Sequence, residues 1–235
     1  MTELLYLNDT YLFDCEAKIL GQAQDDRGAY LVLDRTIFYP QGGGQPSDQG
    51  NIKAEEFNVE VTHVRQVDGE IRHYVNTVLN DIKVNKAVSC VVDKNRRLLN
   101  ARYHTAAHLL GNAVEKIYPM LKAMKGHSFP QEAYLEFSGS EIPDISEVMN
   151  NLQQAIEADL ATQIFEIDPM EFEEKFYKLP YKIPENKTFR VMQIGDYLPV
   201  PCGGTHLNHL AEIGTIKLGK IKAKNGLVRV SYEVT

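Results

Sequence analysis

Four residues of types that bind metal ions occur as two pairs, about a hundred positions apart in the chain. The first pair is His104 and His108, in the segment RYHTAAHLLG. The second pair is Cys202 and His206, in the segment PCGGTH. Three imidazoles and one thiolate form a donor set that suits Zn2+ in a tetrahedral site. The two pairs together therefore predict one zinc ion per chain.

Each pair lies in a local sequence that lets its side chains converge. On a helix, side chains four positions apart lie on one face, with about 5–6 Å between their Cβ atoms, so the two histidines of the first pair can face one ion. The two glycines inside the second pair permit backbone angles that are closed to other residues. A metalloprotease helix would carry glutamate at position 105, and Thr105 excludes that class.

The remaining histidines and cysteines are weaker candidates. His209 is close enough in sequence to rival His206, but we expect it to be exposed, and His127 is a less favoured candidate ligand. His63 and His73 are expected to be structural. Cys15 and Cys90 are expected to be small buried residues.

A glycine-rich segment, FYPQGGGQPSD at residues 38–48, needs its own explanation. It lacks the lysine of a phosphate-binding loop. Gly43 and Gly44 allow a sharp turn or the close approach of a ligand to the backbone. Gln45 could offer its side-chain amide to such a ligand. An ordinary turn is the alternative.

Composition limits the class of protein. The 235 residues are 43% hydrophobic, no apolar run reaches the ~18 residues of a membrane helix, and the N-terminus does not resemble a secretory signal. Three scattered cysteines favour a reducing cytoplasm. The net charge of -7 argues against broad nonspecific nucleic-acid binding. Two local basic clusters remain, Lys94–Arg102 and the acid-free segment 213–232, which includes Lys222 and Lys224.

The pattern along the chain predicts an α+β protein. Strands are expected at residues 30–34, 59–64, 87–92, 213–218 and 227–232, and helices at 93–118, 145–161 and after Asp168. Many short strands with glycine turns predict a small β-barrel in residues 1–89. Residues 90–235 are then a second, zinc-binding domain.

The motifs resemble those of the AlaX-type trans-editing proteins, which are relatives of the alanyl-tRNA synthetase editing domain. TIFYPQGGGQPSD is similar to the family's glycine motif, RYHTAAHLL to its first metal motif and PCGGTH to its second. The closing strands IGTIK and KNGLVRV are also similar. The glycine motif is typical of the medium-length members, and implies an N-terminal β-barrel followed by a two-layer α/β editing domain with an antiparallel sheet.

The resemblance implies a function and a set of site residues. The function is hydrolysis of the ester bond in mischarged tRNA(Ala), chiefly Ser-tRNA(Ala), with Gly-tRNA(Ala) as a second substrate. His104, His108, Cys202 and His206 are then the zinc ligands. Gln45 matches a glutamine important for editing, and Thr36 matches a threonine that recognises the serine hydroxyl.

Two other classes stay open at this point. One is a zinc-stabilised RNA-binding module without catalysis, and the other is a zinc hydrolase for a different acyl ester. A catalytic zinc normally has three protein ligands and an open position, whereas four candidate ligands are present here. Water could take a fifth position, a ligand could be weak, or a tRNA hydroxyl could act in place of water.

Overall fold

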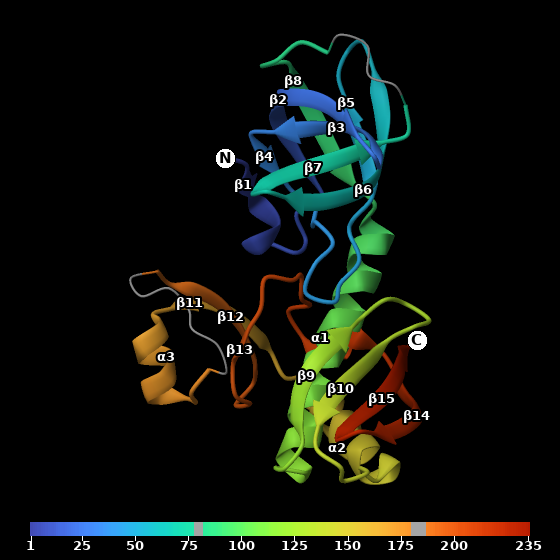
Figure 1. The fold of residues 1–235 in the computed structure, drawn as a ribbon, viewed down its shortest axis with the longest axis vertical. Coiled ribbons are helices and arrows are strands. Elements are labelled where there is room, and N and C mark those ends of the chain that lie inside the picture. Colours follow the sequence, from blue (N-terminus) through green and yellow to red (C-terminus); the bar gives the residue numbers. More distant parts are fainter. Residues whose placement is uncertain (78–81, 180–186) are drawn as a thin grey trace. The chain divides into compact units, whose positions relative to one another are not determined.

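The computed structural model describes residues 1–77, 82–179 and 187–235 (Figure 1). By packing, the chain divides into two compact units, Met1–Ala101 and Arg102–Thr235. Within the described residues, no helix has both the length and the apolar character that crossing a membrane requires.

Six strands of the first unit form a closed barrel in the order β2-β3-β7-β6-β5-β8. Their bounds are β2 Asp14–Asp25, β3 Gly28–Leu33, β5 Gly50–Lys53, β6 Asn58–Val67, β7 Glu70–Val75 and β8 Ala87–Val92. Outside the barrel, β1 (Glu3–Leu4) pairs in parallel with β4 (Arg35–Thr36), and a 3-10 turn, η1, spans Leu5–Leu7.

Alternation of side chains explains how these strands close around a core. In β8, Val88, Cys90 and Val92 are buried and the residues between them are not. This period of two places one face of each strand inside the barrel. Cys90 lies directly opposite Cys15 of β2. Cys90 is buried as expected, whereas Cys15 is only half-buried because it lies nearer the end of its strand.

The glycine-rich segment folds into a tight hairpin. The backbone N–H of Gln45 donates to the carbonyl of Gly42 at 2.8 Å, and the reverse bond is 3.2 Å long. The two residues between them, Gly43 and Gly44, have φ angles of 52° and 79°. A two-residue loop with positive φ at both positions is the turn that fits the twist of paired strands, and glycine adopts it without strain.

A fully buried ion pair fixes the base of this hairpin. The guanidinium of Arg97 donates to the carboxylate of Asp48 at 2.5–3.1 Å, and also to the carbonyls of Thr10 (2.9 Å) and Ile37. The Tyr39 N–H donates to the same carboxylate at 2.6 Å. Neither side chain of the pair is exposed. Every charge is therefore matched, which a buried ion pair requires.

Within its described residues, the second unit contains two antiparallel sheets, three α-helices and one 3-10 helix. One sheet has the order β14-β15-β10-β9 and the other β11-β12-β13. The strands are β9 Lys122–His127, β10 Tyr134–Ser138, β11 Thr162–Ile167, β12 Phe189–Ile194, β13 Val200–Pro201, β14 Ile216–Lys224 and β15 Leu227–Val234. The helices are α1 Lys94–Ile117, α2 Ile145–Glu157, α3 Pro169–Lys175 and the 3-10 helix η2 Leu210–Ile213.

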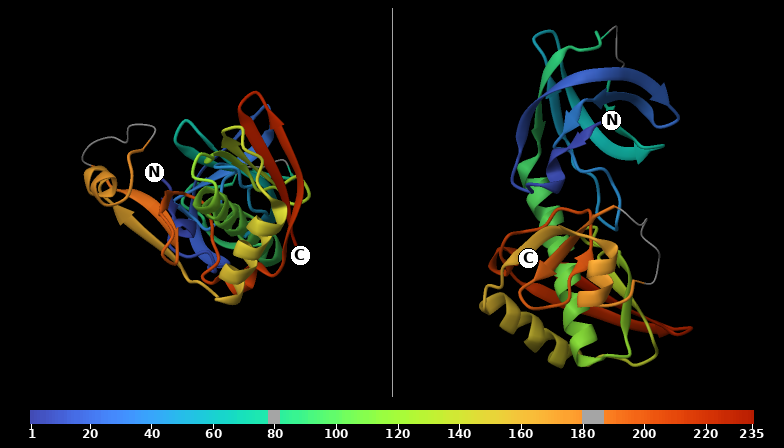
Figure 2. Two further views of the ribbon diagram at one scale, coloured as in Figure 1. Left: turned by 90° about the horizontal axis from the view of Figure 1, so that it is seen from below. Right: turned by 90° about the vertical axis from the view of Figure 1, so that its left-hand side faces the viewer.

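Helix α1 packs along the inner face of the four-stranded sheet, as Figure 2 shows from two sides. A side chain at Gly111 would meet Leu135 of β10 at 3.3 Å, so the helix backbone lies close to the strand. Eight residues earlier on the helix, the Tyr103 carbonyl accepts a 2.9 Å hydrogen bond from the Tyr232 hydroxyl of β15. The part of α1 that begins at Arg102 therefore starts at one end of the sheet.

The predicted α+β class, with an N-terminal barrel and antiparallel sheets, is confirmed. Asp168 caps α3 as expected, and its side chain accepts from two backbone N–H groups. The strand expected at 213–218 begins only at Ile216, because Ile213 ends η2 and Gly214 turns the chain with φ of 78°. The units divide between Ala101 and Arg102, inside α1. The domain boundary at 89/90 stays a prediction.

Replacing Asp48 tests the buried ion pair. Asp48→Asn keeps the shape but leaves the Arg97 charge without a counter-ion, which costs about 3–5 kcal/mol in buried pairs. We expect urea unfolding, followed by circular dichroism, to show a free energy of unfolding lower by about this amount. Glu56→Gln, which breaks the exposed pair with Lys86, is the matched control and should leave the urea midpoint almost unchanged. Equal effects of the two changes would contradict this account of the hairpin.

Candidate metal centre

Two elements of the second unit bring the four candidate ligands together. His104 and His108 lie one turn apart on α1, and Cys202 and His206 lie in the loop that follows β13. Their ligand atoms all fall within 4.8 Å of one another. Among the described residues this is the group of His, Cys, Asp and Glu side chains that could hold a metal ion, and it contains no carboxylate.

The spacing of the donor atoms fits a tetrahedral zinc site. The sulfur of Cys202 lies 3.2 Å from Nε2 of His206 and 3.6 Å from Nε2 of His104. Zinc bonds of about 2.3 Å to sulfur and about 2.0–2.1 Å to nitrogen, at tetrahedral angles, would separate sulfur and nitrogen by roughly 3.5 Å. The three imidazole centroids are 4.6–5.0 Å apart. No large movement is needed for one ion to touch all four residues.

Burial keeps the imidazoles neutral. Desolvation lowers the pKa of His104 and His206 well below the ordinary value, and lowers the pKa of His108 to about 4. The nearby His108 imidazole and the Arg190 guanidinium lower the pKa of His104 and His206 further. A neutral imidazole keeps a lone pair on nitrogen, which is the form that binds metal.

Burial acts in the opposite direction on the thiol. Desolvation raises the pKa of Cys202, because the thiolate is the charged form. The Gly204 N–H, 3.4 Å from the sulfur, and the Arg190 guanidinium partly offset this rise. A cation among the four donors would displace the thiol proton and supply the charge that the thiolate needs. The chemistry of the donor set therefore fits a metal ion.

Three hydrogen bonds hold the ligand loop against its neighbours. The N–H of Leu207 donates to the Thr105 hydroxyl of α1 at 3.1 Å. Nη1 of Arg190, on β12, donates to the carbonyl of Cys202 at 2.5 Å, and the Cys202 N–H donates to the Arg190 carbonyl at 3.1 Å. Sequence reasoning missed Arg190. A lone arginine carries no spacing pattern that would have singled it out.

The weaker histidine candidates lie outside the ligand group. His209 is exposed as expected, and its ring lies 3.5 Å from the Asp159 carboxylate. His127 stacks on Phe129 and Tyr134. In the first unit, His63 accepts from Arg65 and bonds Ser47, which agrees with a structural role.

Thr36 belongs to a buried network in the first unit. Nδ1 of His73 lies 3.0 Å from the Leu31 carbonyl, which can only accept, so this nitrogen carries the proton. Nε2 of His73 then accepts from the Thr36 hydroxyl at 2.8 Å. The same hydroxyl oxygen accepts the Phe38 N–H at 3.0 Å. Desolvation lowers the pKa of His73 to about 4, which keeps this arrangement uncharged at neutral pH.

The other predicted site residues lie on the two units as follows. Gln45 is buried at the end of the glycine turn, beside Gly43 and Gly44. Lys222 and Lys224 are exposed on β14 of the second unit. The structure thus brings the four metal ligands together in one unit, whereas Thr36 and Gln45 belong to the other.

Two protein families match parts of the chain. The family described as tRNA synthetases class II (A) matches residues 8–96. The family described as threonyl and alanyl tRNA synthetase second additional domain matches residues 189–231, which include Cys202 and His206. The ligands on α1 lie between these two matches.

Individual relatives match over almost the whole chain. The alanyl-tRNA editing protein AlaX-L of Pyrococcus horikoshii is 35% identical over 99% of this chain and 58% of its own length. The alanine--tRNA ligase of Methanobrevibacter smithii is 32% identical over 98% of this chain, which spans only 27% of that enzyme. AlaX-M of Methanosarcina barkeri is 32% identical over 99% of this chain and 98% of its own length. With a relative matched from end to end in this way, the chain belongs to the AlaX family of alanyl-tRNA editing proteins.

Proposed function

We propose that the chain is a zinc-dependent deacylase for mischarged tRNA(Ala), acting in the cytoplasm. Its substrate is chiefly Ser-tRNA(Ala), with Gly-tRNA(Ala) as a second candidate. The reaction adds water across the ester bond and releases the amino acid and a free tRNA hydroxyl. The observation that supports this proposal most strongly is the group of three imidazoles and one thiol within 4.8 Å, in a member of the AlaX family.

His104, His108, Cys202 and His206 are the proposed ligands of one zinc ion. When bound there, zinc would supply a positive charge that polarises an ester carbonyl or lowers the pKa of a bound water. No carboxylate belongs to the ligand group among the described residues, so a protein general base is not supplied from within it. Activation of the nucleophile by a tRNA hydroxyl is compatible with four protein ligands.

Gln45 and Thr36 are the proposed substrate contacts of the first unit. The positive φ angles of Gly43 and Gly44 let the backbone turn tightly beside Gln45 without side chains on the turn. Gln45 would present its amide to the aminoacyl group. The Thr36 hydroxyl donates a hydrogen bond to Nε2 of His73 and accepts one from the Phe38 N–H. The remaining lone pair would accept the serine hydroxyl proton.

A deacylation assay with three substrates tests the proposed function against its alternatives. We expect hydrolysis of Ser-tRNA(Ala), slow or no hydrolysis of Ala-tRNA(Ala), and little action on a tRNA-free serine ester. An RNA-binding module without catalysis would bind tRNA(Ala) and hydrolyse none of the three. Fast hydrolysis of the tRNA-free ester would instead indicate a hydrolase for a different class of substrate. Either result would overturn the proposal.

Metal analysis of purified protein tests the ligand set. We expect one zinc per chain in the wild type. Cys202→Ala removes the soft donor and should lower the zinc content well below that of the wild type, because fewer ligands hold the ion. Cys15→Ala makes the same chemical change on the barrel and should retain full zinc. Equal zinc in all three proteins would remove Cys202 from the ligand set.

Thr36→Val tests how serine is distinguished from alanine. Valine has nearly the shape of threonine without its hydroxyl, so the contact to the serine side chain is lost. A site that hydrogen-bonds a substrate hydroxyl strongly rejects the analogue without it. We expect the ratio of rates on Ser-tRNA(Ala) and Ala-tRNA(Ala) to fall by at least about tenfold. Zinc content should not change.

Thr36→Ser is the matched control for this experiment, since it keeps the hydroxyl and should keep most of the rate ratio. Only Thr36→Val leaves the hydrogen-bonding groups of His73 and Phe38 without the Thr36 hydroxyl. Circular dichroism of both variants therefore shows whether the barrel is still folded when the rate ratio falls. If Thr36→Val retained the wild-type ratio, the sensor of the serine hydroxyl would lie elsewhere, with Thr105 and Thr205 beside the ligands as the next candidates.

A further inference from the structure

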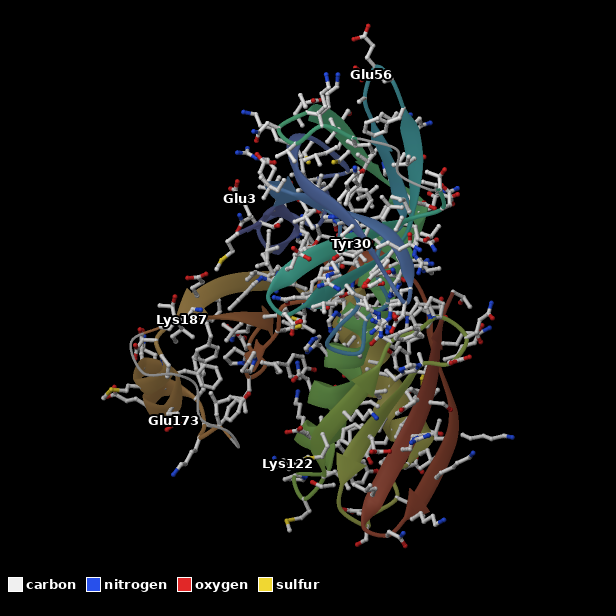
Figure 3. The ribbon with its side chains drawn as sticks, turned by 45° about the horizontal axis from the view of Figure 1, so that its top comes forward. Glu3, Tyr30, Glu56, Lys122, Glu173 and Lys187 are labelled. Atoms are coloured by element: carbon white, nitrogen blue, oxygen red, sulfur yellow. The ribbon has the colours of Figure 1, made fainter. Side chains whose placement is uncertain are left out.

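The outer face of the four-stranded sheet is basic although the chain as a whole is acidic. Strand register places Leu135, Phe137, Val228 and Val230 on the inner face, where they are buried. The alternate residues point outward, and most of them are exposed. The cations on this outer face are Lys125, Lys217, Lys222, Lys224 and Arg229, whereas Lys122 of β9 pairs with Glu115 of α1. Figure 3 labels Lys122, where its side chain extends from β9.

A stack of flat side chains stands among these cations. The ring of His127 is parallel to that of Phe129, with centroids 4.3 Å apart and an interplanar angle of 5°. It also stacks on its cross-strand partner Tyr134 at 5.2 Å and 26°. The guanidinium of Arg229 lies 4.0 Å from the Tyr134 ring centroid. The three rings are half-buried, and the Arg229 side chain at one end of the stack is exposed.

An ion pair holds Arg229 at one end of the stack, and a carboxylate lies beside His127. Arg229 donates to the Glu136 carboxylate at 3.0 Å from Nη2 and 3.3 Å from Nε. His127 lies 3.7 Å from the carboxylate of Glu132. The planes are therefore positioned before any ligand arrives, which reduces the ordering that binding requires.

Rings and cations together select one class of partner. Lysines alone would suit any anionic surface, including an acidic protein or duplex RNA. Flat rings beside lysines suit unpaired nucleotides, because each base offers a face for stacking and each phosphate a charge. In a duplex those base faces are already covered by neighbouring base pairs. The outer face thus has the two features with which proteins bind single-stranded nucleic acid.

The stack lies at the end of the sheet nearest the metal ligands on α1. Ser128, the residue after His127, bonds the Tyr232 hydroxyl at 3.1 Å. That hydroxyl donates to the carbonyl of Tyr103, the residue before His104. At the other end of β9, Ala123 and Lys122 bond Glu115, about three turns farther along the helix. Strand β9 therefore runs antiparallel to α1, and His127 is level with the first ligand.

We propose that the stack of His127, Phe129, Tyr134 and Arg229 binds unpaired nucleotides of RNA, with the surrounding lysines on the phosphates. This inference rests on the proposed function for the identity of the RNA, which is the single-stranded end of tRNA that carries the ester. Because the stack is level with His104 on α1, the single-stranded end of the tRNA is favoured over its paired parts.

A single tryptophan at position 134 reports on stacking directly, since the chain has no tryptophan of its own. A short single-stranded RNA should quench the fluorescence of Tyr134→Trp, because a base that joins the stack comes close to the indole. A strand of the same length without bases, and a duplex, should leave it unchanged. Phe57→Trp, in the first unit, is the control and should respond to none of them. Binding seen by anisotropy without quenching at position 134 would overturn the proposal.

Two further variants separate stacking from charge. Tyr134→Leu should weaken binding of the base-bearing strand about tenfold or more and leave binding of the abasic strand unchanged. Lys222→Glu should weaken both strands and flatten the dependence of binding on salt. Equal weakening of both strands by Tyr134→Leu would show a merely structural role for the ring. Because an unacylated strand needs no hydrolysis, failure of the deacylation assay would leave this result standing.

Discussion

The organisation of the second unit depends on holding four donor atoms close together with little water around them. Three imidazoles and a thiol within 4.8 Å would gain little from one another without a cation. Desolvation keeps the imidazoles neutral and opposes the thiolate, so the group is electrostatically incomplete until a positive ion enters. Helix α1 supplies two ligands one turn apart, and the loop after β13 supplies two more. The hydrogen bond from Leu207 to Thr105 ties that loop to that helix.

In the first unit as well, two networks of buried polar groups are matched by partners, and there the matched groups hold the fold. Arg97 and Asp48 satisfy each other and the backbone at the base of the glycine hairpin. His73 of barrel strand β7 and Thr36 of β4 do so as well. The first network fixes the segment that carries Gln45, and the second fixes Thr36. The AlaX resemblance associates both residues with editing. Rigid support of this kind is what a site needs when it distinguishes substrates by a single hydroxyl.

Local patterns explain why parts of this structure could be predicted from sequence and others could not. The helix through His104 and the loop at Cys202 have short-range signals, namely four-residue spacing and paired glycines. Strand β9, with the sequence KAMKGH, is largely exposed and shows no apolar alternation, so it was not expected. The partnership of Arg97 with Asp48, 49 positions apart, and the stack at His127 depend on long-range packing. Such contacts leave no periodicity in the chain.

X-ray absorption at the zinc edge of the purified protein tests the central claim most directly, because it measures which atoms surround the metal. Three imidazoles and one thiolate predict a first shell of one sulfur at about 2.3 Å and three nitrogens at about 2.0 Å. In Cys202→Ala reconstituted with zinc, the sulfur contribution should disappear while imidazole scattering remains. A wild-type spectrum with only nitrogen and oxygen neighbours, or one unchanged by Cys202→Ala, would contradict the assignment of this group as the zinc centre.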